Sequence, residues 1–382
     1  MTDSSADALR MAGRIAILVR GLAGGGAQRD AILLANGLAE RGAPSAIVTL
    51  DASGPLRDLI DARVPLVDLG QGRKLRMAAA IPALRRFFRQ ARPRVFIASE
   101  ASGNAIATLA WMTMPKLRRP RLVLREVASP LHARATDPYR QNRIGYRLAP
   151  WIYPMADLVV ALTEPARRDL VEQFRVPAGK VACLGTNAVF SAADYRRLST
   201  APRQVEAGLV ATVGRLSAEK DFATLIEAIA VVRQTRPVRL AIAGEGPERG
   251  ALEALVAARG LGDAVEFLGF QADPTPLLLR AALFVSSSRY EGFGNVIVEA
   301  LAAGAPVVAT DAPYGPRAIL LEGQLGPLVP VGDIDALASA IGATLDAPAA
   351  SPLLRARAAG FTAEAAADAL LGLLNARHLL DV

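Results

Sequence analysis

The chain contains 382 residues, of which 52% are hydrophobic and 21% charged, and this composition excludes a disordered chain, a collagen and a coiled coil. Its single cysteine, Cys183, excludes an intramolecular disulfide, and no zinc-binding pattern is present. The net charge of +8 is uneven, because residues 1–200 hold 30 Lys and Arg against 16 Asp and Glu, whereas residues 201–382 hold 14 against 20. Opposite charge in the two halves favours two domains with different surroundings.

Short apolar runs alternate with helical stretches along the whole chain. Most of these runs are continuously apolar, which is typical of parallel strands covered on both faces. The pattern therefore predicts an α/β protein with βαβ units in both halves. In chain order, the predicted strands are 15–19, 46–50, 95–98, 122–124, 158–162, 209–213, 240–243, 265–268, 283–286 and 307–309, and the clearest helical stretches are 28–41, 222–236, 293–303 and 363–380.

A domain boundary is predicted in the segment 191–206, which has few apolar residues. We expect two Rossmann-like, doubly wound domains, 1–195 and 205–362, that face each other across a cleft. The amphipathic helix 363–380 is expected to cross back to the first domain. No run of ~18 apolar residues and no signal-peptide pattern is found, so the sequence predicts a cytoplasmic protein that is not integral to a membrane.

A glycine-rich segment, 21–28, follows the first predicted strand and opens a helix. Glycines allow backbone N–H groups to approach an anion at a helix N-terminus. A flexible strand-to-helix turn explains the segment equally well. The spacing matches neither the dinucleotide fingerprint nor a P-loop.

Two further loops follow predicted strands in the second half. Arg215 and Lys220 come after the strand 209–213, at the edge where ligands of open α/β sheets bind. Two fixed cations there can neutralise a diphosphate without a metal, although ordinary solvated charges give the same pattern. The turn 244–247 is expected to be structural.

The most specific pattern is a pair of carboxylates, Glu291 and Glu299, around a predicted helix start near Phe293. The glycine-rich segment between them exposes backbone N–H groups to an anion. A sugar nucleotide explains both features, because its hydroxyls bind the carboxylates and its phosphates bind the N–H groups.

Taken together, these segments resemble the retaining, sugar-nucleotide-dependent glycosyltransferases of family 4 (group 1), which have the GT-B fold. The resemblance covers most of the chain and is strongest over 209–332. The matching motifs are E-x7-E at Glu291 and Glu299, G-R-L-x-x-x-K at 214–220, G-x-G-P at 244–247, G-G-A-[EQ]-R at 25–29 and G-P-R at 315–317.

The resemblance implies a role for each matching residue. Arg215 and Lys220 would clamp the donor diphosphate and stabilise charge on the departing nucleotide, and Glu291 would hold hydroxyls of the donor sugar. The other implied contacts are Gly292, Phe293, Gly294 and Asn295 beside Glu291, Glu299 on the ribose, Gly269 and Phe270 on the base, and Gly25 and Gly26 near the donor phosphate and acceptor.

The first half departs from the family at one point. Many relatives carry a histidine beside the donor sugar, but here His132 comes a few residues late. Arg125 and Glu126 are candidates instead, and Asn104 is a further candidate on the acceptor or donor-sugar side.

The second half also departs from the family at one point. Ala318 follows G-P-R where relatives often have an acid, which leaves the identity of the donor sugar open.

The resemblance implies a reaction without a metal or other cofactor. The acceptor would attack from the leaving-group side, with the β-phosphate accepting its proton. The predicted protein is a retaining hexosyl- or N-acetylhexosaminyltransferase that uses a nucleotide sugar, with UDP favoured, and a glycan or lipid-linked acceptor in surface polysaccharide or glycolipid synthesis. A non-catalytic sugar-nucleotide-binding protein and a nucleotide-sugar epimerase remain alternatives.

Two basic clusters, 73–92 and 116–121, lie in the first half. Ordinary solvated faces explain them, and so does an anionic membrane surface at the inner face of the membrane. Nucleic acid is disfavoured, because no nucleic-acid-binding motif is present and the second half is negative.

Overall fold

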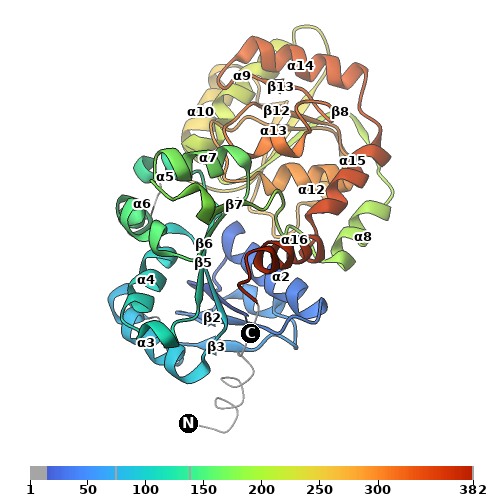
Figure 1. Cartoon of the computed structure of the whole chain (residues 1–382). Helices are drawn as coiled ribbons and strands as arrows, with labels where there is room; N and C mark the ends of the chain where they lie inside the picture. The colour runs from blue at the N-terminus through green and yellow to red at the C-terminus, as the bar shows by residue number, and fades with distance from the viewer. Residues whose placement is uncertain (1–14, 74, 137–138, 381–382) are drawn as a thin grey trace. The chain divides into compact units, whose positions relative to one another are not determined.

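The computed structural model describes residues 15–73, 75–136 and 139–380, which form two compact units (Figure 1). The first unit comprises the chain up to Ala192 and the chain from Phe361 onward. The second unit comprises Ala193–Gly360. Most of helix α8 (Ala192–Thr200), which falls within the predicted boundary segment, therefore belongs to the second unit.

The first unit is built on a sheet that has seven strands within the described residues, in the order β3-β2-β1-β4-β5-β6-β7. All of the paired strands are parallel. The direction of winding reverses between β1 and β4, so the loops after these strands flank a ligand-binding position typical of doubly wound sheets. The strands are β1 (Ile15–Val19), β2 (Ser45–Thr49), β3 (Leu66–Asp68), β4 (Val95–Ser99), β5 (Arg121–Glu126), β6 (Leu158–Ala161) and β7 (Val181–Cys183).

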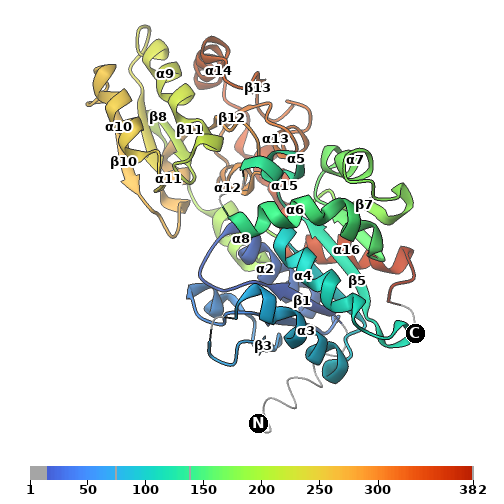
Figure 2. The same ribbon diagram turned by 90° about the vertical axis from the view of Figure 1, so that its left-hand side faces the viewer.

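Helices cover both faces of this sheet (Figures 1 and 2). Right-handed crossovers place α2 on one face and α3, α4 and α6 on the other, because the chain winds in opposite directions after β1 and after β3. Helix α4 packs against both α3 and α6. The helices are α2 (Gly26–Glu40), η1 (Pro55–Leu59), α3 (Met77–Ala91), α4 (Ala101–Met112), η2 (Lys116–Arg118), α5 (Pro130–Thr136), α6 (Arg140–Ile152), η3 (Tyr153–Met155), α7 (Glu164–Glu172), η4 (Ala178–Lys180) and α16 (Ala363–Ala376).

Helix α16 returns from the end of the chain and packs against α2. The N–H of Ala363 donates to the carbonyl oxygen of Phe190 at 2.7 Å. A Cβ atom at Gly37 would collide with the carbonyl oxygen of Ala363, so glycine permits the close approach of the two helices. Arg41 also pairs with Asp368 at 2.6 Å.

The second unit contains a parallel sheet whose six described strands have the order β10-β9-β8-β11-β12-β13. Its winding reverses between β8 and β11. The predicted α/β class, with a doubly wound sheet in each half, is thereby confirmed. The strands are β8 (Glu206–Val213), β9 (Arg239–Ala243), β10 (Val265–Gly269), β11 (Ala281–Ser286), β12 (Val307–Thr310) and β13 (Leu328–Val329).

Aliphatic side chains fill the core of the second unit, where α9 packs against α14 over the sheet. Leu225 and Ile229 of α9 and Leu337 and Ile341 of α14 are fully buried there. The helices are α8, η5 (Ala218–Lys220), α9 (Phe222–Val232), α10 (Arg249–Ala258), α11 (Thr275–Arg280), α12 (Asn295–Ala303), α13 (Gly315–Ile319), α14 (Ile334–Asp346), α15 (Ser351–Ala358) and η6 (Ala359–Phe361).

Over the part of the chain that the structure describes, no helix combines the length and the apolar character needed to span a membrane.

Candidate functional site

The second unit brings several predicted donor residues to the carboxyl ends of β8 and β11. Arg215 and Lys220 follow β8, and Glu291 follows β11. The loops after these two strands diverge to opposite faces of the sheet, which opens a crevice between them. The predicted cations and the first predicted carboxylate therefore lie at the position where such sheets bind ligands.

Lys220 and Glu291 form the central ion pair of this edge. Lys220 Nζ lies 2.6 Å from Glu291 Oε1, and the same oxygen accepts a hydrogen bond from Ser288 Oγ at 2.7 Å. The two side chains are 21% and 12% exposed, so the pair is shielded but still reachable from solvent. A hollow of about 30 Å³ beside the pair is also lined by Asn295. A phosphate can therefore compete for Lys220, and a hydroxyl can bind Glu291.

Glycine determines where α12 begins. Gly294 has a φ of 105°, and the first helical residue is Asn295, two residues later than the predicted start at Phe293. No side chain caps this end of the nine-residue helix, whose N-terminus carries a partial positive charge. A Cβ atom at Gly315 would collide with the carbonyl oxygen of Phe293, so the turn before α12 is packed directly against the start of α13. The predicted segment of Gly292 to Asn295 is thus a fixed loop that ends in a helix N-terminus.

The turn 244–247 supports the loop that carries Arg215. The N–H of Leu216 donates to the carbonyl oxygen of Glu245 at 3.0 Å. A Cβ atom at Gly244 would collide with the backbone of Gly214, and one at Gly246 would collide with the backbone of Leu216. These glycines are therefore needed for close contact between two loops, which is the physical meaning of the G-x-G-P motif here.

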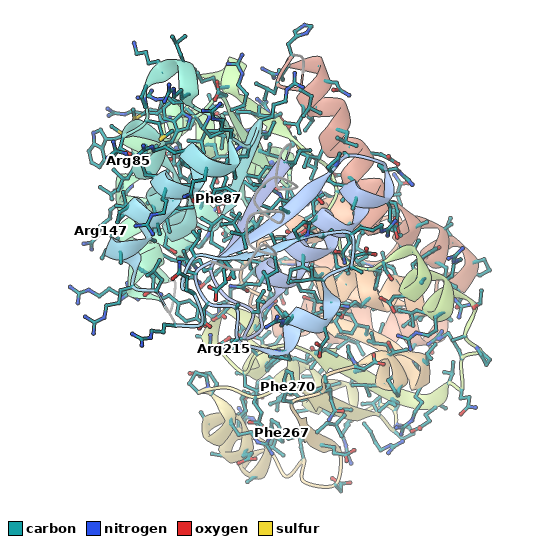
Figure 3. All side chains as sticks on the ribbon, turned by 90° about the horizontal axis from the view of Figure 1, so that it is seen from below. Arg85, Phe87, Arg147, Arg215, Phe267 and Phe270 are labelled. Carbon is teal, nitrogen blue, oxygen red and sulfur yellow. The ribbon has the colours of Figure 1, made fainter. Side chains whose placement is uncertain are left out.

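Arg215 and Phe270 remain accessible at this edge (Figure 3). The side chain of Arg215 is exposed and forms no ion pair or side-chain hydrogen bond with any described residue. Phe270 follows β10 and is 76% exposed, a state suited to stacking on a planar base. Gly269, with a φ of 69°, accepts a hydrogen bond from the N–H of Gly244 at 2.8 Å, which fixes the start of this loop.

Glu299 lies on α12, about one turn after the helix begins, and is partly buried. The edge of the second unit thus combines two cations, an uncapped helix N-terminus and two carboxylates. Such a set can bind a diphosphate through Arg215 and Lys220 and bind hydroxyl groups through Glu291 and Glu299.

In the first unit, the glycine-rich loop follows β1 at the reversal point. Gly24 and Gly25 have φ values of 134° and 124°, which side-chain-bearing residues rarely adopt. Helix α2 begins at Gly26 and has no side-chain cap. The predicted residues Gly25 and Gly26 therefore lie at an exposed helix N-terminus, as an anion-binding loop requires.

Three polar side chains that the sequence analysis did not single out as site residues meet beside this loop. Glu100 accepts hydrogen bonds from Arg20 Nε and from Gln28 Nε2, the latter at 2.9 Å. The ring of Tyr139 lies 5.6 Å from the guanidinium carbon of Arg20. Glu100 has a φ of 64°, a strained conformation that is often found at functional sites. The position of Glu100 directly after β4 is the signal in the sequence that could have marked it as a site residue. Its backbone strain cannot be read from the residue types.

Arg125 is fully buried. Its Nη1 lies 2.9 Å from Asp30 Oδ2, and its Nη2 donates to Asp30 Oδ1 at 3.2 Å and to Asn187 Oδ1 at 3.4 Å. This pair ties β5 to α2 in the interior of the first unit. The structure therefore gives Arg125 a buried partner within the first unit, and its side chain is not exposed to solvent.

Glu126 and Asn104 belong to a buried polar network. Glu126 accepts hydrogen bonds from the hydroxyls of Tyr146 and Tyr153 at 2.8 and 2.9 Å. Asn104 Nδ2 donates to the hydroxyl of Tyr153 at 3.0 Å and to the carbonyl oxygen of Arg125 at 3.1 Å. Burial, followed by the charge of Glu126, raises the pKa of Tyr153 well above its usual value. These side chains join α4, β5 and α6 and do not reach solvent.

His132 is the partly exposed member of the four candidates predicted for the acceptor or donor-sugar side. It lies on α5, with Nδ1 3.0 Å from Ser129 Oγ. Across residues 15–73, 75–136 and 139–380, no group of three or more His, Cys, Asp and Glu side chains is arranged to hold a metal ion.

Solved structures share the architecture of the chain. The Anabaena protein HepE, in complex with UDP and glucose, matches with a TM-score of 0.70 over 95% of this chain and 99% of its own. The two sequences are 22% identical, so this likeness concerns the fold. The two doubly wound units have the GT-B fold.

Sequence models of glycosyltransferase families match both units. Residues 24–185 match "Glycosyltransferase Family 4", and residues 207–347 match "Glycosyl transferases group 1". The chain belongs to this glycosyltransferase family.

Curated relatives match part of the chain. A lipopolysaccharide core biosynthesis glycosyltransferase of Rhizobium meliloti is 39% identical over 41% of this chain. The Campylobacter jejuni N-acetylgalactosamine-N,N'-diacetylbacillosaminyl-diphospho-undecaprenol 4-alpha-N-acetylgalactosaminyltransferase is 31% identical over 60% of it. The chain spans 44% and 60% of the lengths of these two relatives, respectively.

Proposed function

We propose that the protein transfers a hexosyl or N-acetylhexosaminyl group from a nucleotide sugar, with UDP favoured, to a glycan or lipid-linked acceptor. The observation that carries this proposal is the Lys220–Glu291 pair at the reversal point of the second unit, beside the uncapped start of α12. A phosphate-binding cation and a hydroxyl-binding carboxylate at one edge fit a sugar linked to a diphosphate.

The donor roles follow from the charges of the second unit. Arg215 and Lys220 would bind the diphosphate and stabilise the negative charge that grows on it as the anomeric bond breaks. Glu291 would hold hydroxyls of the transferred sugar, Glu299 the ribose, and Phe270 the base. The cations supply positive charge at the diphosphate, so we expect turnover to persist in excess EDTA.

Retention of anomeric configuration belongs to the same proposal. The acceptor oxygen would attack the anomeric carbon from the side that the diphosphate leaves, and the β-phosphate would take the acceptor proton. This route needs no basic side chain of the protein. It is supported by the family to which the chain belongs, and it is tested by the anomeric configuration of the product.

The choice of donor and acceptor is supported by the relatives. HepE was solved with UDP, and the Campylobacter relative is named for a diphospho-undecaprenol acceptor. We propose that this chain likewise takes a lipid-linked or polysaccharide acceptor, bound by the first unit. Such an acceptor places the enzyme at the inner face of the membrane.

The first experiment is a thermal-shift screen with UDP-, GDP- and ADP-sugars, followed by turnover of the sugar that stabilises the protein. We expect Glu291→Gln to keep nucleotide binding and to lose turnover by on the order of a hundredfold or more. Wild-type turnover by Glu291→Gln would contradict the assignment. Donor binding without transfer or hydrolysis would favour a non-catalytic binding protein.

A further inference from the structure

Helix α6 exposes an apolar stripe on the outer face of the first unit. Ile144, Leu148 and Trp151 are all exposed, and spacings of four and three residues place them on one side of the helix. Trp151 is 70% exposed, whereas Tyr146 on the opposite side of the helix is buried. The helix therefore carries large apolar side chains on its solvent-exposed side as well as on the side that packs into the first unit.

The apolar surface continues on the neighbouring elements. Leu109 and Met112 are exposed in the last turn of α4, which packs against α6. Leu117, on η2 just beyond α4, is fully exposed, with a relative exposure of 102%. Helices α3, α4 and α6 all run from the carboxyl edge of the sheet back to its amino edge, so their last turns lie along the same edge.

Arginines flank this apolar surface. Arg85 and Arg89 of α3 and Arg140 and Arg147 of α6 form no ion pair or side-chain hydrogen bond within the described residues. Figure 3 shows Arg85 and Arg147 extending outward from this side of the first unit. The sequence from 69 to 156 holds 17 Lys and Arg against three Asp and Glu, so its positive charge is largely uncompensated.

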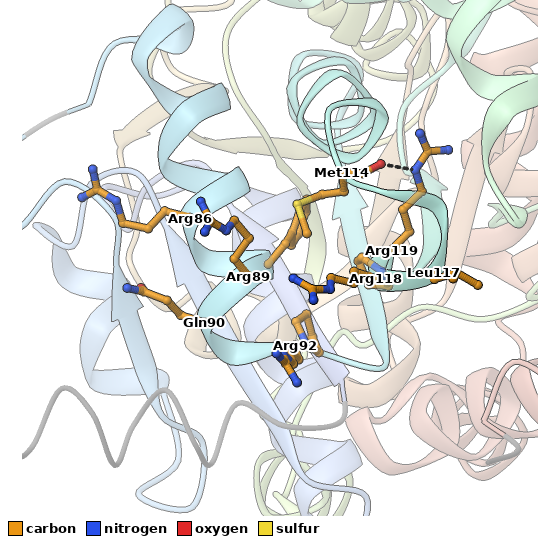
Figure 4. Close-up of a pocket in the computed structure, with 11 residues that line it drawn as sticks. Arg86, Arg89, Gln90, Arg92, Met114, Leu117, Arg118 and Arg119 are labelled. Carbon is orange, nitrogen blue, oxygen red and sulfur yellow. Dashed lines mark hydrogen bonds between the residues drawn. The ribbon is translucent and has the colours of Figure 1, made fainter.

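Further arginines line a hollow of about 710 Å³ at the end of α3 (Figure 4). Arg119 is held in place, because it donates to the carbonyl oxygens of Met112 and Met114, both at 2.9 Å. Within the described residues the lining contains no carboxylate, and its guanidinium groups other than that of Arg119 form no ion pair or side-chain hydrogen bond there, which suits them to phosphate. The arginines that line the hollow are Arg86, Arg89, Arg92, Arg118 and Arg119.

We propose that the face formed by α3, α4, η2 and α6 docks on a bilayer that contains anionic phospholipid. The stripe of Ile144, Leu148 and Trp151 enters the interface, and the arginines bind headgroup phosphates. This proposal rests on the proposed function, since a lipid-linked acceptor lies in such a bilayer. A nucleic acid would match the arginines but leave the apolar stripe unexplained, and a second copy would bring the same positive charge to this face.

The docking face also begins beside the polar cluster of the first unit. Tyr139, the residue before α6, is exposed, and its ring lies against Arg20, which binds Glu100. Docking along α6 therefore brings lipid headgroups close to the carboxyl edge of the first sheet. A lipid-linked acceptor can reach that edge without leaving the membrane.

The test is flotation of the full chain with vesicles of phosphatidylcholine containing 30 mol% phosphatidylglycerol, compared with phosphatidylcholine alone. We expect binding to the anionic vesicles that weakens with salt. Arg85→Glu/Arg86→Glu/Arg89→Glu should lower the partition coefficient by on the order of a hundredfold, because each basic residue contributes about fivefold near an anionic surface. Leu148→Ser/Trp151→Ser should lower it by about tenfold.

A matched control is available on the opposite face. Arg57 and Leu59 of η1 are exposed beside α2, and Arg57→Glu/Leu59→Ser should bind vesicles like the wild type. The chain has two tryptophans, so comparison with Trp151→Phe isolates the signal of Trp151. We expect brominated lipid to quench that signal.

Three results would overturn the docking proposal: no vesicle binding by the wild type, equal losses in the control variant, or no quenching of Trp151. Thermal shift with UDP separates this failure from failure of the proposed function. A wild type that binds UDP but no vesicles refutes only the docking face. If the chain binds nucleic acid more strongly than vesicles at the same salt concentration, nucleic acid rather than the membrane is the partner of this face.

Discussion

Oppositely charged pairs near the sheet edges of the two units have similar residue types but different surroundings. Arg125 and Asp30 in the first unit are 0% and 1% exposed, whereas Lys220 and Glu291 in the second are 21% and 12% exposed. The first pair is enclosed by the protein and ties β5 to α2, and Arg125 Nε has no hydrogen-bond partner among the described residues. The second can exchange its partners for a ligand. Burial, rather than position after a strand, therefore separates a structural pair from a site.

The largest effect is expected from breaking the buried pair. Arg125→Ala should lower the free energy of unfolding by about 3–5 kcal/mol, because it leaves the Asp30 carboxylate buried without its cation. Urea denaturation measures this loss. The double variant Arg125→Met/Asp30→Leu should recover most of it. A loss below about 1 kcal/mol for Arg125→Ala would show that water reaches Asp30.

The partly exposed pair, Lys220 and Glu291, should affect turnover more than stability. Lys220→Ala should reduce turnover by on the order of 10²–10³, since a cation that stabilises the leaving diphosphate is removed. Its free energy of unfolding should change by about 1 kcal/mol or less, because Glu291 keeps Ser288 and solvent as partners. Lys220→Arg is the control and should retain part of the activity. A large loss of stability without a loss of turnover would assign this pair to the fold.

Glu126→Gln tests whether the neighbouring carboxylate in the first unit is structural. An amide group cannot accept both tyrosine hydroxyls as the carboxylate does, so we expect a loss of about 1–3 kcal/mol in unfolding free energy. Turnover measured well below the melting temperature should remain within about threefold of the wild type. Loss of turnover with unchanged stability would instead give Glu126 a direct role in the reaction.

The smallest effect is expected from an exposed pair in the first unit. Hydrogen bonds from Arg63 hold the pKa of Asp61 at about 2, below its usual value. A lowered pKa in the folded state stabilises the protein above the unfolded pKa of 3.8, and this contribution disappears as the pH falls toward 2. Asp61→Asn should therefore cost less than about 1 kcal/mol at pH 7 and nothing well below pH 2. An equal cost at both pH values would point to a lost hydrogen bond rather than a lost charge.

The fold could be predicted from the sequence because continuous apolar runs that alternate with helical stretches are typical of parallel strands covered on both faces. Strands β3, β7 and β13 were not predicted, since two or three residues carry too little pattern. The start of α12 was placed two residues early, because the left-handed conformation of Gly294 delays the helix.

The site was predictable in the second unit, where glycine spacing and charge lie in compact motifs. In the first unit, the burial of Arg125 depends on Asp30, which lies on another helix far away in sequence. The conformation of Glu100 likewise depends on how β4 meets α4. Such features come from tertiary packing, so local residue types could not reveal them.

The return of α16 to α2 has a consequence for how the protein is made. Helix α2 leaves the ribosome before the second unit is synthesised, whereas α16, which covers it, leaves after the second unit. The whole of the second unit emerges in between. The apolar side of α2 near Gly37 therefore stays uncovered until the second unit has been synthesised, so termination before α16 would release a first unit with exposed apolar surface that is prone to aggregation.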